Sequence, residues 1–230
     1  MKKSLHALTD NEETDKRDSV ARILNAAAIA FMENGFAATS IDTVAEVLGS
    51  TKGKIYYHYK SKTDLFLAVH RDAMTQYVNA IEKIAAGGGD PVERLRAALR
   101  ALAMQIMTRL AFSRVAVQGV ELHMSRSTTP AQRKTLKSVI AMRDRGEQIL
   151  IDIVAEGVEK GYFRPCEPRL IVKPMLGAIN WMTMWYRPRS DETPETRERL
   201  AKEIIDYLVL GIAADKRSDA AKGGASGTSA

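Results

Sequence analysis

Apolar residues recur at helical spacing in almost every segment of this chain, whereas no segment shows the alternation with period two that a half-buried strand requires. The clearest stripe contains Leu95, Leu99, Leu102, Ile106 and Leu110, which share one face of a helix. The pattern therefore predicts an all-α fold.

Glycines, prolines and capping residues divide this pattern into separate helices. A first helix is expected from about Lys16 to Asn34, because Gly35 supplies the left-handed residue that often closes a helix. Another should begin at Asp90-Pro91-Val92-Glu93, where a capping side chain precedes a proline at the first helical position and a glutamate at the third. Later helices are expected at about 113–124, 130–160, 168–186 and 194–212.

Two short helices are expected between these long ones. Thr39 or Ser40 can cap the first of them. The second should run over about 51–57 and carry Ile55 and Tyr56 inward, and a longer helix follows it. Two short helices that flank a glycine turn and follow a longer helix are typical of helix-turn-helix proteins, in which the second short helix enters the major groove of DNA.

The charge pattern supports this interpretation, since the segment from Gly49 to Ser61 contains lysines and no acid, although a solvated lysine face is the alternative. Hydroxyls at the helix N-termini would donate to phosphates, and residues after the second helix would grip phosphates. Lys52 and Lys54, on the first turn of that helix, would reach guanine O6 and N7. The candidate DNA-binding residues are Thr39, Ser40, Thr51, Lys52, Lys54, Tyr56, Tyr57, His58, Lys60 and Lys62.

Two segments carry a family motif, Thr39-Ser40-Ile41-Asp42-Thr43-Val44-Ala45 and Lys52-Gly53-Lys54-Ile55-Tyr56-Tyr57-His58-Tyr59-Lys60-Ser61-Lys62-Thr63-Asp64-Leu65-Phe66. Together they resemble the DNA-binding domain of the TetR family, and the likeness covers roughly residues 17 to 66. The chain departs from the usual pattern at Leu48-Gly49-Ser50-Thr51 and at Lys54, where a small residue is common. The operator sequence therefore cannot be taken from a relative.

The resemblance implies that the C-terminal helices dimerise the protein and enclose a ligand cavity. A two-fold dimer would read two half-sites about one turn of DNA apart. The last two helices are the expected interface and would form a four-helix bundle in the dimer, although an internal core is the alternative for the same side chains. The candidate interface residues are Leu176, Ile179, Leu200, Ile204, Leu208 and Ile212.

The cavity is expected among methionines and aromatic residues of the same domain, because flexible thioethers suit an apolar guest. His123 and Asn180 would orient the ligand, unless each makes a structural hydrogen bond instead. The segments Gly161-Tyr162-Phe163-Arg164-Pro165, Gly177-Ala178-Ile179-Asn180-Trp181 and Trp185-Tyr186-Arg187-Pro188 are similar to a signature of TetR members that respond to acyl-CoA thioesters. An acyl-CoA is therefore the expected effector. The candidate ligand-binding residues are Met107, Phe112, His123, Asn180, Trp181, Met184 and Trp185.

Composition narrows the remaining classes of function. The four histidines are scattered, and the one cysteine, Cys166, cannot form a zinc cluster, so we expect no enzyme, metal or cofactor. The formal charge of +6 is compatible with a nucleic-acid partner. Neither a signal peptide nor a transmembrane segment is recognised, which favours a cytoplasmic protein without a membrane partner.

These expectations define four regions of the chain. A flexible basic and polar tail spans 1–16, and a DNA-binding domain spans 17–66, with its linking helix continuing to about 86. A ligand-binding and dimerisation domain spans 67–214, and a disordered tail spans 215–230. The expected function is a homodimeric repressor that a small molecule releases from a palindromic DNA operator. The alternatives are a multidrug-type sensor that represses an efflux pump and a ligand-independent DNA-binding protein.

Overall fold

The computed structural model describes residues 2–123 and 129–213, and the side chains of residues 14–119 and 129–213. Within these residues the chain forms nine α-helices, and the only strand-like pairing is an isolated antiparallel bridge between Phe163 and Ala213. The all-α prediction is thus confirmed. The helices are α1 (Lys2–Ala38), α2 (Ile41–Leu48), α3 (Lys52–His58), α4 (Lys62–Ala85), α5 (Pro91–Thr108), α6 (Leu110–His123), α7 (Pro130–Glu159), α8 (Pro168–Trp185) and α9 (Pro194–Leu210). The expected tail 215–230 lies outside the described residues.

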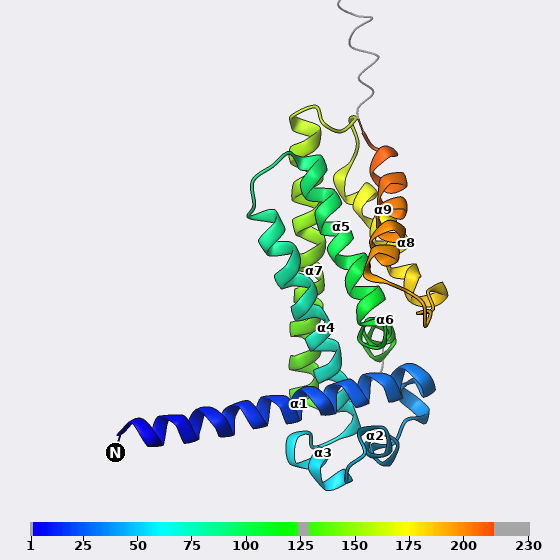
Figure 1. Cartoon of the computed structure of the whole chain (residues 1–230). Helices are drawn as coiled ribbons and strands as arrows, with labels where there is room; N and C mark the ends of the chain where they lie inside the picture. Colours follow the sequence, from blue (N-terminus) through cyan, green and yellow to red (C-terminus); the bar gives the residue numbers. More distant parts are fainter. Residues whose placement is uncertain (1, 124–128, 214–230) are drawn as a thin grey trace, which may run out of the picture. The chain divides into compact units, whose positions relative to one another are not determined.

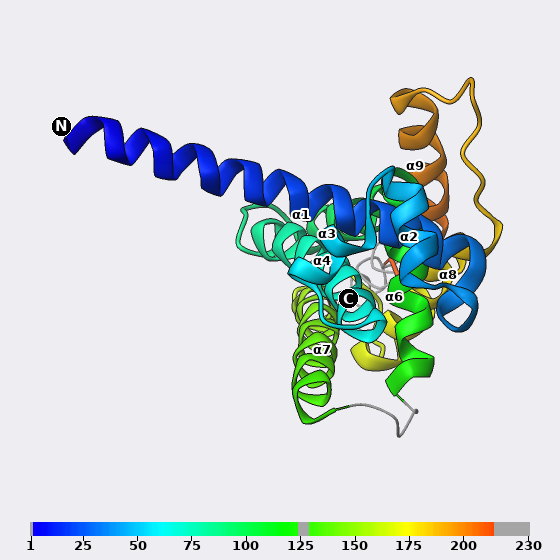
Figure 2. The same cartoon turned by 90° about the horizontal axis from the view of Figure 1, so that it is seen from below.

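Helix α1 begins much earlier than the expected start at about Lys16. It starts at Lys2 because no glycine or proline interrupts the chain before Gly35. The expected end is correct, since Gly35 has a left-handed φ of 73° that breaks the helical run. Figures 1 and 2 show the first half of α1 extending well beyond the α2–α3 pair.

The described helices gather into two compact units that are not contiguous in sequence. Among the described residues, 2–76, 108–123 and 129–143 form the first unit, and 77–107 and 144–213 form the second. The sequence had suggested contiguous domains, whereas α6 and the first half of α7 belong with the helix-turn-helix. The reason lies in α6, whose Phe112 and Val115 are buried in the same apolar core as residues of α1 to α4.

The second unit contains most of the stripe from which the fold was predicted. Leu110 is a correction, because α5 ends at Thr108 and Leu110 begins α6 in the first unit. Leu95 and Leu99 of α5 are fully buried, as the pattern requires. On another side of α5, Arg96 donates to Asp206 at 2.7 Å, so an ion pair joins α5 to α9. Among the described residues no helix is long and apolar enough to cross a membrane.

Candidate nucleic-acid interface

Helices α2 and α3 flank a tight turn in the first unit. The Ser40 hydroxyl accepts the N–H of Thr43 at 3.0 Å, and the Thr43 hydroxyl accepts the N–H of Ser40 at 3.4 Å. Ser40, and not Thr39, is therefore the N-cap of α2, and its hydroxyl accepts a backbone N–H of that helix. At the other end Gly49 adopts a left-handed φ of 64°, which lets the chain reverse into α3.

One fully buried side chain, Ile55, anchors α3 to the core of the unit. Tyr56 is 49% exposed, so the expectation that it points inward is wrong. A helix of seven residues has only one side against the core, and Ile55 fills it. Tyr57 is 77% exposed, and its ring lies edge-on to that of half-buried His58, with 4.9 Å between the ring centres.

The outer side of α3 and the turn that follows it present cations. Lys52, Lys54 and Lys60 are all exposed. Lys52 lies 3.2 Å from the carboxylate of Asp42, but both side chains are mostly in solvent, where such a pair contributes little. Thr51 caps α3 through its backbone position alone, which leaves its hydroxyl available to a phosphate. Cationic and hydroxyl side chains are therefore exposed along α3 and in the turn that follows it.

Thr39 does not belong to this surface. Its side chain is 1% exposed, and its hydroxyl donates to the carbonyl of Gly35 at 2.6 Å and approaches that of Ala30 at 3.2 Å. The prediction that Thr39 contacts a phosphate is therefore wrong. The hydroxyl instead satisfies carbonyls that the end of a helix leaves without partners.

Lys62 is half-buried and already bonded within the protein. Its ammonium donates to the carbonyls of Phe36 at 2.8 Å and Ala37 at 3.0 Å, and lies 4.7 Å from the centre of the Phe36 ring. The Phe36 ring in turn packs edge-on against Phe66 of α4, with 4.9 Å between centres. Lys62 therefore closes the end of α1, and one of its three N–H groups remains for another partner.

The N-terminus of α4, directly behind Lys60, is held by a polar cluster. Ser61 accepts the N–H of Asp64 at 3.1 Å and donates to its carboxylate at 2.8 Å. Gln132 of α7, which is 7% exposed, donates to Ser61 at 3.2 Å and to Asp64 at 3.1 Å. The sequence reading missed Gln132, although Thr129-Pro130-Ala131-Gln132 has the spacing of a helix-capping box that could have identified it.

The predicted ligand-binding residues lie in different surroundings within each unit. Phe112 is buried in the core of the first unit under the guanidinium of Arg109, 3.9 Å from its ring centre, and Met107 is buried in the second unit. The side chain of His123 lies outside those described. The other four candidates are exposed on α8, which is a correction, because a cavity within the chain would bury them; they are Asn180, Trp181, Met184 and Trp185.

The same helices correct part of the predicted dimer interface. Ile179 and Ile212 are buried inside the chain, so they cannot contact a second copy. Leu176, Leu200, Ile204 and Leu208 are half-buried. Helical periodicity revealed an apolar side of each helix, but α8 has apolar residues on two sides, and the spacing could not tell which one faces the core.

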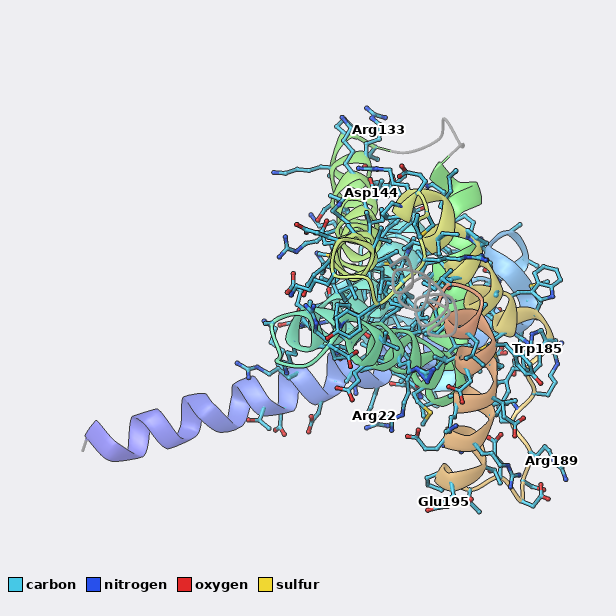
Figure 3. The ribbon with its side chains drawn as sticks, turned by 90° about the horizontal axis from the view of Figure 1, so that it is seen from above. Arg22, Arg133, Asp144, Trp185, Arg189 and Glu195 are labelled. Carbon is cyan, nitrogen blue, oxygen red and sulfur yellow. The ribbon has the colours of Figure 1, made fainter. Side chains whose placement is uncertain are left out.

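Large apolar side chains on α8 and α9 are exposed. They are Leu170, Trp181, Met184 and Trp185 of α8 and Tyr207 and Leu210 of α9. Trp181 is 63% exposed and Tyr207 is 81% exposed, and Trp185 lies at the outer edge of the second unit in Figure 3. We call these six residues the α8–α9 face. Exposed apolar groups of this size commonly mark interfaces between proteins.

Helix α4 also carries two buried titratable side chains, His70 and Tyr77. Burial, and secondarily the charge of Arg143, lowers the pKa of His70 from 6.5 to about 4. Burial, and secondarily Glu147, raises the pKa of Tyr77. No group of three or more His, Cys, Asp or Glu side chains within the described part of the chain could hold a metal ion.

Two family models match separate parts of the chain. Residues 23–69 match the family model described as bacterial regulatory proteins of the tetR family, and residues 88–212 match a tetracyclin repressor-like C-terminal domain. The HTH-type transcriptional repressor KstR2 of Mycobacterium tuberculosis is 24% identical over 198 residues, which cover 83% of this chain and 90% of KstR2.

Solved structures share the fold. The TetR family regulator PfmR of Thermus thermophilus is 33% identical, with a TM-score of 0.70 over 82% of this chain and 97% of PfmR. AibR, solved in complex with isovaleryl coenzyme A and operator DNA, has a TM-score of 0.67 at 23% identity, over 83% of this chain and 98% of AibR. At that identity the likeness to AibR concerns the fold alone.

Proposed function

Since the chain belongs to the TetR family of bacterial transcriptional regulators, which are DNA-binding proteins and not enzymes, we propose that it represses transcription as a homodimer bound to a palindromic operator. We further propose that a small molecule, an acyl-CoA thioester, releases it from that operator.

The basic surface of α3 is the observation that carries the DNA-binding part of this proposal. Lys54 and Lys60 extend into solvent without an ion pair among the described residues, and the Thr51 hydroxyl makes no capping bond. Lys54, on the first turn of α3, suits contacts to guanine in the major groove. Lys60, Tyr57 and Thr51 suit phosphate oxygens, which fix the register without reading sequence.

Selection of bound duplexes from a random DNA pool tests this proposal. We expect a pseudo-palindrome whose half-sites are about one helical turn apart, and a binding constant that falls steeply with salt because phosphate contacts release counterions. A protein that enriches no sequence and binds with no salt dependence contradicts the proposal.

The α8–α9 face supports the dimer. Burying two tryptophans, Trp181 and Trp185, between two copies removes large apolar areas from water at low cost in side-chain entropy. A two-fold axis through this face makes the contact self-complementary, as closed dimers require. Analytical ultracentrifugation should therefore give twice the mass of one chain.

The acyl-CoA effector is supported by the C-terminal sequence signature and by the names of similar proteins. These include AibR with isovaleryl coenzyme A and the fatty acid metabolism regulator of Bacillus subtilis, which is 23% identical. Short, long, sterol-derived and aromatic CoA thioesters should each be titrated into the protein–operator complex, and at least one should lower operator affinity. By linkage, the operator must lower affinity for that thioester by the same factor. Release by lipophilic cations and by no thioester would favour the efflux-sensor alternative.

A further inference from the structure

Two helix caps meet at Gln132. One of them begins at Ser61, shortly after the end of α3, the proposed recognition helix, at His58. On α7 the side-chain carbonyl of Gln132 accepts the N–H of Thr129 at 3.0 Å, and the Thr129 hydroxyl accepts the N–H of Gln132 at 3.2 Å. At the start of α4 the Ser61 hydroxyl forms a second cap, because it accepts the N–H of Asp64 and donates to the Asp64 carboxylate. The side-chain amide of Gln132 donates to both Ser61 and Asp64, so it joins the two caps.

Every polar group of this side chain is used. Both amide protons and the carbonyl oxygen of Gln132 have partners, and the side chain is buried. Buried hydrogen bonds of this kind fix one geometry, because any other leaves a donor or acceptor without a partner. Only Tyr59 and Lys60 separate Ser61 from the end of α3. A constraint on Ser61 is therefore a constraint on the C-terminal end of α3 and on Lys60.

Helix α7 contributes residues to both compact units. Its first half, where Arg133 marks the start in Figure 3, belongs to the same compact unit as α3, and its second half belongs to the other unit. Helix α4 likewise continues from the first unit into the second. The hydrogen bonds of Gln132 to Ser61 and Asp64 thus link the N-terminal ends of α4 and α7 within the first unit.

We infer that Gln132 is a positioning residue for operator binding, which holds the start of α4 and thereby the recognition helix in the orientation that fits DNA. This inference rests on the proposed binding of DNA by α3. Gln132 itself touches no DNA. Its loss reduces the fraction of molecules whose recognition helix is correctly placed, and the apparent affinity falls in proportion to that fraction.

The test is Gln132→Met in the full-length protein, because methionine keeps the length and bulk of the side chain and removes its three hydrogen bonds. Affinity is measured for the operator selected from the random pool. We expect a loss of about 3- to 10-fold for operator, with an unchanged slope of log affinity against log salt, because no cation is removed. Amide hydrogen exchange should accelerate at residues 61–65.

Two controls separate positioning from general destabilisation. Gln148→Met makes the same chemical change on α7 at a side chain bonded to Asp152 at 2.7 Å, and Val139→Ala truncates a buried side chain of α7 away from the caps. Neither should lower operator affinity more than about twofold. An equal loss in Val139→Ala, at matched unfolding free energy, would overturn the inference.

A compensating pair of substitutions tests the contact between Gln132 and Asp64 directly. Gln132→Glu places a carboxylate against Asp64 and should weaken operator binding more than Gln132→Met does. Adding Asp64→Asn restores an amide opposite a carboxylate and should recover affinity to within about threefold. Wild-type affinity in Gln132→Met, or no recovery in the double variant, rejects the positioning role. If the wild-type protein selects no operator, the proposed function itself fails.

Discussion

The imidazole of His70 in α4 packs directly on Gly119 of α6, so closely that a β-carbon at position 119 would overlap the ring. Both residues belong to the first unit. Nδ1 of His70 has no hydrogen-bond partner among the described residues. This packing excludes water from the ring, which explains why the neutral form is favoured.

Acid should therefore destabilise the protein through His70. The unfolded chain binds a proton near pH 6.5 and the folded chain only near pH 4, so stability is unaffected above 6.5 and falls as the pH drops through this window. The expected loss by pH 4 is about 3 kcal/mol. Urea unfolding from pH 7 to 4 should show this component in the wild type and not in His70→Phe. Identical pH profiles for the two proteins would exclude it.

Gly119 should tolerate no larger residue. Gly119→Ala forces the His70 ring to move within a packed core, and we expect a loss of about 1 to 3 kcal/mol in unfolding free energy despite the better helix propensity of alanine. The matched control is Gly53→Ala in α3, where a β-carbon would lie at an ordinary 3.8 Å from Thr51. That variant should be as stable as the wild type or more so. Equal effects at both positions would contradict the packing argument.

Features of the fold that depend on neighbouring residues were predicted from the sequence, and features that depend on distant contacts were not. Caps and breakers are local, so Pro130, Pro168 and Pro194 were read correctly as helix starts and Gly35 as a helix end. The association of α6 with the helix-turn-helix depends on contacts between distant segments. Phe112 looks the same in sequence whether it lines a cavity or packs against α1.

Lys60 should act on DNA only through its charge. Lys60→Ala should weaken operator and random DNA by the same factor and reduce the slope of log affinity against log salt by about one unit. Fluorescence anisotropy titrations at salt concentrations from about 50 to about 300 mM, a range that includes physiological ionic strength, measure the affinity and its dependence on salt. Lys83→Ala removes an exposed lysine of the second unit and is the control. An unchanged slope for Lys60→Ala would remove this residue from the interface.

Lys54 should instead affect which bases are preferred. Replacing it with alanine should cost the selected operator about 1 to 3 kcal/mol and random DNA much less. Repeating the selection with the variant should relax the preference at one or two positions in each half-site. Equal losses on both kinds of DNA would show that Lys54 contacts phosphate only.

Trp181 should be needed for dimerisation and not for folding. It is mostly exposed in the single chain, so Trp181→Glu should leave the helical content unchanged while giving a monomer with at least about tenfold weaker operator binding. Ile179→Glu is the contrasting variant, because it puts a charge into the core of the chain and should unfold it. Sedimentation and circular dichroism distinguish the two outcomes. A dimeric Trp181→Glu protein would place the interface elsewhere.

The candidate site shows the same division between local and distant signals. The exposed lysines of α3 could be read from an acid-free segment, because charge is visible in sequence. The roles of Thr39 and Lys62 could not, since a buried hydroxyl and a half-buried ammonium depend on carbonyls that the end of α1 brings to them. Trp181 was predicted to line a ligand cavity, but it is 63% exposed, whereas Ile179 on the other side of α8 is buried.

In the proposed dimer, the exposed α8–α9 face would also make protein copy number a regulatory variable. A chain whose partner-binding face is apolar dimerises by mass action, and only the dimer presents two recognition helices to both half-sites. When most chains are monomeric and the operator is mostly free, occupancy rises with the square of the chain concentration, so halving expression lowers occupancy about fourfold. A cell could then lift repression of the target genes by dilution through growth alone, before any effector accumulates.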